Sequence, residues 1–188
     1  MWGWTIGNLA RAGRRFRKSQ GGATAVEFAL VAGPFFYVLG CICETGLMLF
    51  SEYVLQNATQ DAARLVRTGH VSTTSGTLLM TAAEFKTQVC ATVSIIFDCS
   101  SKVTVYVNSA DSFAALTAAV DDPVNIGASA DGTPYAQVYT PGGTLKAVAV
   151  IATYDWDFVF PFMEFLGNID GNNKRRLYGI ALFRNEPF

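Results

Sequence analysis

The run from Ala23 to Phe50 is almost entirely apolar, and it constrains the fold more than any other part of the 188-residue chain. Only Glu27 and Glu44 bring charge into it. As one helix, the run would extend about 42 Å, which exceeds the roughly 30 Å hydrocarbon core of a bilayer. A cleavable secretory core has only about 7–15 apolar residues, so this run is too long for one. We therefore predict a retained transmembrane helix over residues 23–50.

Charge is distributed unevenly on either side of this run. Residues 1–22 hold five basic residues and no acid, whereas the remainder holds nine basic and fifteen acidic residues. Basic residues before an apolar helix keep that side in the cytoplasm. We therefore expect residues 1–22 to be a basic cytoplasmic leader, and the part of the chain after about Phe50 to lie on the outer side of the membrane. Nothing further along the chain is basic enough to suggest a nucleic-acid partner. We therefore expect the chain to contact membrane lipid and no nucleic acid.

The two acids of the run raise different questions. A carboxylate inside a membrane costs about 2.5–3.5 kcal/mol on insertion scales. We expect Glu44 at the outer interface, with its carboxylate reaching water. Glu27 has two interpretations: it lies at the inner interface, or it pairs with the α-amino group that a cut between Gly22 and Ala23 would release. The second interpretation also benefits from the helix dipole, which favours an acid in the first turns.

The remainder of the chain predicts an α+β fold. Helical spacing continues after the membrane and indicates an amphipathic stem helix over residues 51–69. Residues 70–188 then predict a small extracytoplasmic domain, in which a roughly three-stranded antiparallel sheet packs on short helices. Strands are expected at 102–108, 145–156 and 175–183, helices at 81–93 and 112–120, and a long loop at 121–144.

Two further segments bear on how the exported domain is built. Cys90 and Cys99 are nine residues apart and would pair in an oxidising periplasm, contributing on the order of 2–3 kcal/mol. The aromatic segment Phe158–Leu166 has two interpretations: it forms an edge of the domain core, or it is an exposed patch for a partner or for the outer membrane leaflet.

Motifs for catalysis or metal binding are missing from the sequence. His70 is the sole histidine and lies in a polar turn region, so no His-based catalytic pair and no ordinary zinc site can be assembled. Phosphate-binding glycine loops and nucleophile elbows are also missing. We therefore expect no enzyme activity, no catalytic residue, no metal and no cofactor.

Three segments together carry a family resemblance. Arg14-Arg-Phe-Arg-Lys-Ser-Gln-Gly-Gly-Ala-Thr-Ala-Val-Glu-Phe-Ala-Leu-Val31 resembles the N-terminal signature of TadE-like pseudopilins, minor subunits of the tight adherence (Tad) branch of type IV pili. Gln60–Gly69 resembles the family's post-membrane helix, and Arg184–Phe188 resembles its C-terminal end. The resemblance covers residues 11–70 well, and the middle of the chain only in general layout.

The resemblance implies a site at the start of the apolar run. Gly22 would be the last leader residue and Ala23 the new N-terminus, cut by a membrane-embedded aspartic prepilin peptidase. Glu27 would then be the fifth mature residue. Phe28 would be the sixth, where major Tad pilins usually have tyrosine. Glu27 and Phe28 would act in helix packing and charge neutralisation.

The resemblance also implies a function and its partners. The chain would be a minor pseudopilin that helps to initiate, cap or anchor a Tad-type adhesion pilus. Its partners would be other pilins and pseudopilins, the prepilin peptidase and the inner-membrane assembly platform. The alternative is an uncleaved single-pass membrane scaffold or sensor, whose periplasmic domain binds a partner.

Overall fold

The computed structural model describes residues 22–94, 98–118, 138–169 and 174–188. The chain divides into two units, Met1–Cys43 and Glu44–Phe188. The expected basic leader and most of the expected loop at 121–144 lie outside the described residues. The boundary between the two units lies between Cys43 and Glu44, whereas we expected the membrane helix to end at Phe50.

Helix α2 (Ala23–Arg67) is the longest element and passes through Pro34 without interruption. In the first unit none of its residues is buried. From Glu44 onward the helix buries one face in the second unit, through residues at three- and four-residue intervals. The buried residues are Glu44, Met48, Ser51, Leu55, Ala58, Thr59, Ala62, Ala63 and Val66.

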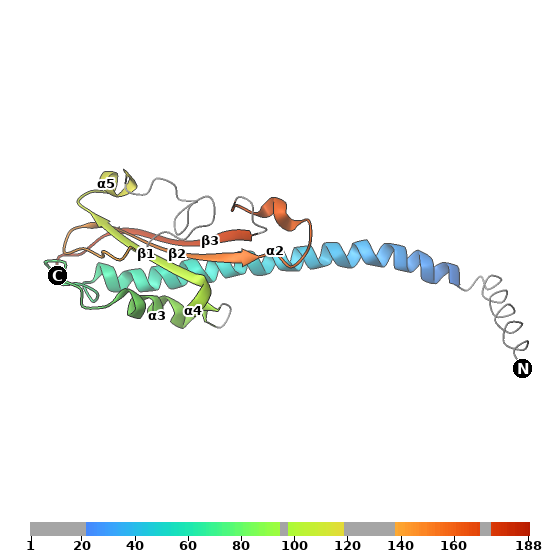
Figure 1. Ribbon diagram of the computed structural model, residues 1–188, viewed down its shortest axis with the longest axis horizontal. Helices are drawn as coiled ribbons and strands as arrows, with labels where there is room; N and C mark the ends of the chain where they lie inside the picture. Colours follow the sequence, from blue (N-terminus) through green and yellow to red (C-terminus); the bar gives the residue numbers. More distant parts are fainter. Residues whose placement is uncertain (1–21, 95–97, 119–137, 170–173) are drawn as a thin grey trace, which may run out of the picture. The chain divides into compact units, whose positions relative to one another are not determined.

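The second unit is built on a three-stranded antiparallel sheet, as the sequence predicted. Its strands are β1 (Val103–Ala110), β2 (Ala147–Asp157) and β3 (Lys174–Arg184), in the order β1-β2-β3 (Figure 1). The central strand β2 is buried along most of its length, which fits its unbroken apolar run Ala147–Ala152.

Short helices complete the second unit. They are α3 (Ala82–Val93), α4 (Cys99–Lys102), α5 (Phe113–Ala118) and the 3₁₀ turn η2 (Met163–Leu166). The expected capping box starts α3: Thr81 Oγ1 accepts from Glu84 N at 3.3 Å, and Thr81 N donates to Glu84 Oε2 at 2.8 Å. The hydrogen bonds that Thr81 N and, secondly, Thr81 Oγ1 donate to the Glu84 carboxylate lower the pKa of Glu84.

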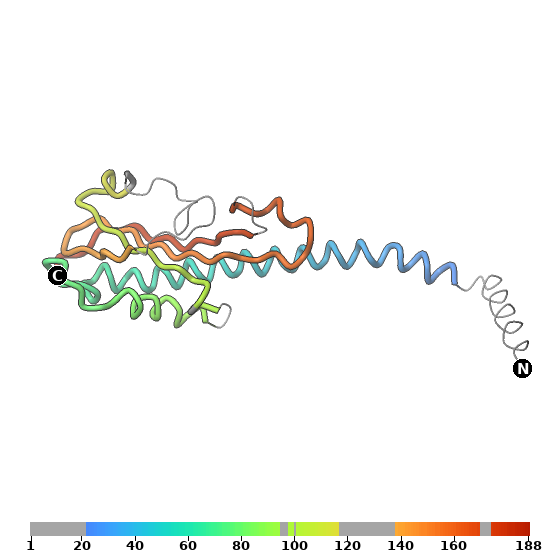
Figure 2. Tube along the Cα trace, viewed as in Figure 1, coloured from blue at the N-terminus to red at the C-terminus, as the bar shows by residue number. Residues whose placement is uncertain are grey.

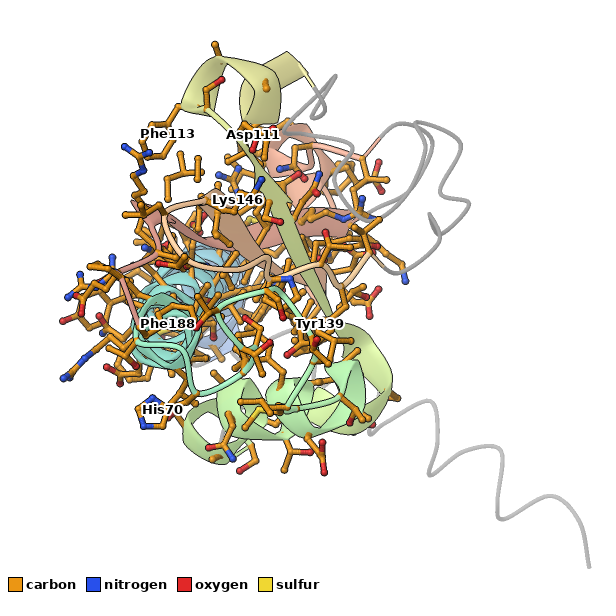
Figure 3. The ribbon with its side chains drawn as sticks, turned by 90° about the vertical axis from the view of Figure 1, so that its left-hand side faces the viewer. His70, Asp111, Phe113, Tyr139, Lys146 and Phe188 are labelled. Atoms are coloured by element: carbon orange, nitrogen blue, oxygen red, sulfur yellow. A yellow bond between two sulfur atoms is a disulfide. The ribbon has the colours of Figure 1, made fainter. Side chains whose placement is uncertain are left out.

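Both faces of the sheet are covered. Helix α3 and the second half of α2 lie on one side, and α5 lies on the other (Figures 1 and 3). On the α5 side, Leu116 packs with Tyr106 and Ile151 in a buried cluster. On the other side α2 approaches β3 very closely at Gly179, where a Cβ would collide with Thr59 Oγ1 and the Leu55 carbonyl. Glycine at this position therefore lets the helix dock on the strand.

The outer edge of β3 is occupied by two side-chain amides. Gln56 Nε2 donates to Ile180 O and Gln56 Oε1 accepts from Ile180 N, both at 2.8 Å. Asn168 makes the same pair of contacts with Arg176, donating to its O at 3.1 Å and accepting from its N at 2.6 Å. Backbone groups at a sheet edge otherwise invite another strand, so these amides protect part of the edge.

Candidate membrane and assembly site

The residues singled out from the sequence lie at the start of α2. Gly22 directly precedes the helix and Ala23 is its first residue. Glu27 and Phe28 follow within the first two turns, and both side chains are exposed. Among the described residues no hydrogen bond or ion pair to the Glu27 carboxylate is found. The structure thus presents Gly22, Ala23, Glu27 and Phe28 on one exposed helix terminus.

The first-unit part of α2 has the length and composition of a membrane span. An apolar window of this helix has a mean hydropathy of 1.9, and none of that window is buried. At 1.5 Å per residue, the roughly 21 residues from Ala23 to Cys43 cover about 31 Å, close to the hydrocarbon thickness of a bilayer. The side chains that would face lipid include the exposed Leu30, Val31 and Phe36. The helix is therefore suited to membrane insertion.

Glu44, the first residue of the second unit, differs from its expected environment. We expected its carboxylate to reach water, but the residue is only 5% exposed. Its Oε1 accepts a hydrogen bond from Val159 N at 2.6 Å, and its Oε2 accepts one from Phe160 N at 3.1 Å. The reason is that the chain leaves β2 at this point, so these two N–H groups need acceptors outside the sheet. A carboxylate supplies two strong ones.

The segment Phe158–Leu166, which we call the aromatic loop, combines both interpretations offered by its sequence. Phe158 and Met163 are buried and anchor the loop to the domain. Val159, Phe162 and Phe165 are 80%, 80% and 79% exposed. The loop is thus both an edge of the core and an exposed apolar patch.

Contacts on β3 fix the far side of the aromatic loop. Arg175 Nη1 donates to Leu166 O at 2.9 Å, and Asn168 binds the backbone of Arg176. Arg176 in turn makes a bidentate pair with Asp155 on the neighbouring strand, Nε to Oδ1 at 2.6 Å and Nη2 to Oδ2 at 2.9 Å. The hydrogen bond to Asp155 raises the pKa of Arg176, so the guanidinium stays charged in this partly buried position.

The opposite end of the domain holds the two other segments that carry the family resemblance. Arg67 on α2 pairs with Glu186, Nε to Oε1 at 3.0 Å, and Glu186 N donates to Arg67 O at 3.0 Å. The Phe188 ring lies against Gly69, where any Cβ would overlap it (Figure 3). Gly69 also has a φ of 78°, which favours glycine. The structure therefore brings Gln60–Gly69 and Arg184–Phe188 together.

Buried Asn185 completes this end of the domain. Its Nδ2 donates to Pro141 O at 3.1 Å and to Gly143 O at 2.8 Å, which ties the last residues to the turn before β2. Figure 2 shows the red C-terminal trace beside the turn that follows α2. These contacts are structural, since they join segments of one domain to one another.

The structure bonds Cys90 at the end of α3 to Cys99 at the start of α4, with their Cα atoms 5.6 Å apart. This is the pairing expected from the sequence. The disulfide fixes the end of α3 near the start of α4, which directly precedes β1.

Charged groups elsewhere in the domain form pairs at its surface. Lys174 and Lys102 both contact Asp157, at 2.9 Å and 3.2 Å, and the hydrogen bond from Lys174 is the main cause of a lowered Asp157 pKa. Lys146 pairs with Asp111 (Figure 3). Within the described ranges no cluster of three His, Cys, Asp or Glu side chains is placed to hold a metal. His70 Nδ1 is hydrogen-bonded to Thr68 Oγ1 at 2.8 Å in an exposed turn.

Sequence reasoning missed the side chains that organise this arrangement. Gln56 and Glu44 bind backbone groups more than a hundred residues away in the chain, and Asn168 binds the backbone of Arg176, eight residues further on. Glu44 was visible as an acid in an apolar run, but its acceptor role depends on a loop more than a hundred residues later. No local pattern in the sequence points to the two amides.

Comparison with known proteins adds one finding. Residues 22–64 match a family model described as TadE-like protein, the family that the N-terminal motif resembles. The match includes Gly22, Glu27 and most of α2, and it ends within α2, before the sheet. No match is found among the curated proteins or the solved structures.

Proposed function

We propose that this chain is a minor pseudopilin of a Tad-type pilus, inserted in the bacterial inner membrane by α2 and acting in pilus initiation, capping or anchoring. The observation that carries the proposal is the TadE-like match over residues 22–64, which includes the exposed start of α2. A structural role fits the family and the design of the molecule, which combines an exposed apolar helix with a small disulfide-bonded domain.

The proposed mechanism begins with cleavage of the Gly22–Ala23 bond by a prepilin peptidase. Cleavage removes the basic leader and leaves the Ala23 α-amino group at the helix start. Glu27 lies one helical turn further along, so that its carboxylate can pair with the α-amino group of a neighbouring subunit. Pairing offsets the desolvation of both charges when helices pack side by side in lipid. Phe28, beside Glu27, would add apolar contact in the same packing.

The proposed topology follows from the same helix. The basic leader stays in the cytoplasm, and the domain after Cys43 lies in the periplasm, where the Cys90–Cys99 disulfide is stable. Other pilins, pseudopilins and the inner-membrane assembly platform would be the partners of the membrane helix. A second candidate is an uncleaved single-pass scaffold or sensor, which would keep its leader and use the periplasmic domain for binding.

Mass measurement of membrane-extracted protein distinguishes these two functions. The chain is produced with an active prepilin peptidase and, as control, with a catalytically inactive one. A mature N-terminus at Ala23, found only with the active peptidase, supports the pseudopilin. An intact N-terminus in both samples contradicts processing and favours the scaffold. Substituting Gly22→Leu should block the cut, whereas Gly21→Leu should leave it in place if the bond lies after Gly22.

A second experiment tests Glu27. The Glu27→Ala protein should insert as well as the natural one or better, since a costly charge is removed, but it should lose co-isolation with the other pilus subunits. Glu52→Ala is the matched control, because Glu52 lies on the same helix in the second unit. Normal assembly of Glu27→Ala would contradict the charge-pair mechanism.

A further inference from the structure

We propose that the aromatic loop, positioned by Glu44, inserts Val159, Phe162 and Phe165 into the outer interface of the lipid bilayer. The domain would then contact the membrane at a second point besides its helix. This inference rests on the membrane insertion of α2, and it adds a lipid-binding surface to the periplasmic domain.

The first observation is the place of Glu44 along the helix. The residues from Ala23 to Cys43 are long enough to cross the hydrocarbon core, so Glu44 emerges at the outer interface. Its carboxylate is hydrogen-bonded to the backbone of Val159 and Phe160. The aromatic loop is therefore held at the level where the helix leaves the membrane.

The second observation is the way the loop divides its side chains. Phe158 and Met163 point into the domain and hold the loop, while Val159, Phe162 and Phe165 are about four-fifths exposed. Phe162 has a φ of 64°, an uncommon conformation for a phenylalanine. Such strain persists where the surroundings fix the backbone, and it is often found at functional positions.

The third observation is that the loop is fixed at both ends. Glu44 holds its start, and Arg175 and Asn168 hold its end through Leu166 O and the backbone of Arg176. A loop held in this way presents its apolar side chains without first having to be ordered on binding. The loop itself carries one charged residue, the exposed Glu164, and directly outside the loop Asp157 pairs with Lys102 and Lys174.

Lipid is the occupant that these observations favour. The turn of α2 that follows Glu44 also exposes apolar side chains, Leu47 and Phe50 among them. An apolar surface at the end of a membrane span meets the headgroup and acyl boundary, where aromatic side chains are favoured. A second protein surface would have to reach the loop at the same level and exclude lipid from it.

Fluorescence quenching in liposomes tests the proposal on the full chain. Cys41 and Cys43 are replaced by serine, and Phe162→Cys is labelled with the environment-sensitive dye NBD. Ser75→Cys, in an exposed turn at the other end of the domain, is the aqueous control, and Phe36→Cys is the control for the span. Vesicles of phosphatidylcholine and phosphatidylglycerol carry a spin-labelled lipid that quenches near the headgroups, and iodide quenches from water.

The expected result is several-fold stronger lipid quenching at position 162 than at position 75, with weaker iodide quenching. Iodide quenching equal to that at position 75 would overturn the proposal. Protection from both quenchers would also overturn it, because it would indicate a protein contact. If position 36 escapes lipid quenching, the membrane span is wrong and the inference falls with it. If lipid quenching is seen at position 36 but not at position 162, the membrane span is supported and only the insertion of the loop is wrong.

A further variant tests the positioning role of Glu44. Glu44→Gln keeps the shape of the side chain but leaves a single carbonyl acceptor for the two N–H groups of the loop. The label at position 162 should lose part of its lipid quenching in this variant, while Glu52→Gln should leave it unchanged. Equal quenching in both variants would show that Glu44 does not position the loop.

Discussion

The two halves of α2 belong to one helix but have opposite relations to their surroundings. The first half, Ala23–Cys43, is the more apolar, yet none of its residues is buried. The second half carries more polar residues, yet it buries one face against the sheet. Hydrophobicity alone therefore does not tell where a helix is buried. Periodicity does, since apolar residues that recur on one face predict a protein partner, and apolar residues on all faces predict lipid.

The transition between the halves lies at a charged residue. Glu44 is buried because a loop from the domain supplies two N–H donors to it. The domain thus begins at a position where α2 binds a loop more than a hundred residues away in the chain. The following predictions test this contrast between a helix half exposed to lipid and a helix half buried in protein.

The largest effect is expected from truncating the buried half. Leu55 is fully buried under β3, so Leu55→Ala should lower the free energy of unfolding by about 2–5 kcal/mol. Leu39→Ala, in the exposed half, should change it by less than about 0.5 kcal/mol. Chemical denaturation of the full chain in detergent, followed by circular dichroism, measures both. Equal losses would remove the contrast between the halves.

Introducing a charged side chain should have the opposite pattern, with the larger effect in the first half of α2. Val38 and Tyr53 are similarly exposed, at 55% and 65%, but they lie in different halves. Val38→Arg should weaken membrane insertion by about 2.5–3.5 kcal/mol, because the charge would enter the hydrocarbon core. Tyr53→Arg should have little effect. The fraction of protein that resists alkaline extraction from membranes reports the difference, and equal extraction of the two variants would contradict a span that ends near Cys43.

Glycines provide a third comparison, within the second unit. Gly69→Ala should destabilise the domain by about 1–3 kcal/mol, because its φ of 78° is strained for alanine and its Cβ would overlap Phe188. Gly46→Ala should instead stabilise the helix by about 0.5–1 kcal/mol, since nothing lies near its Cβ. Thermal unfolding should show melting temperatures that move in opposite directions. A shared direction would contradict the packing of the C-terminal residues on Gly69.

The smallest effect concerns a phenol in the second unit. Burial, aided by the negative charge of Glu84, raises the pKa of Tyr139 to about 12. The folded state therefore favours the neutral phenol, so its contribution to stability is complete below pH 10 and is lost as the pH rises from about 10 to 12. At pH 11 the loss should approach about 1 kcal/mol.

Tyr139→Phe is the variant that isolates this effect. It removes an oxygen that has no hydrogen-bond partner within the described part of the chain, and the ring can still pack on Phe85 at a centroid distance of 5.7 Å. The variant should lose less stability than the natural protein between pH 9 and pH 11. Tyr53→Phe, at an exposed position, should behave like the natural protein. An unchanged pH dependence in Tyr139→Phe would contradict the raised pKa.

Local patterns were sufficient to predict most of the fold. The apolar period of α2, the capping box at Thr81 and the alternation of β1 each predict an element from neighbouring residues alone. The disulfide was predictable because only two cysteines lie in the part that the sequence predicts to be exported. The three-stranded antiparallel sheet was predicted from three strand patterns, but the order β1-β2-β3 was not part of the prediction.

Contacts between distant residues were not predictable in the same way. An acid such as Glu44 and an amide such as Gln56 have many possible partners, and the choice depends on how the chain folds back. The candidate site at the start of α2 was identified through its resemblance to a family. The energetic cost of placing Glu27 in a membrane marks the residue as unusual, but local chemistry alone does not say what the residue does. The cleavage at Gly22 and the pairing of Glu27 stay predictions.

The contact between Gln56 and Ile180 has a consequence for the order in which the protein folds. The two residues are 124 positions apart, so this face of the stem cannot be fully covered until β3 has been synthesised. Until then its leucines and alanines stay accessible to water and to other chains. Long-range pairing of this kind closes slowly. The domain therefore cannot finish folding before β3 has been synthesised. A chain whose synthesis stops before β3 would leave this face of the stem exposed.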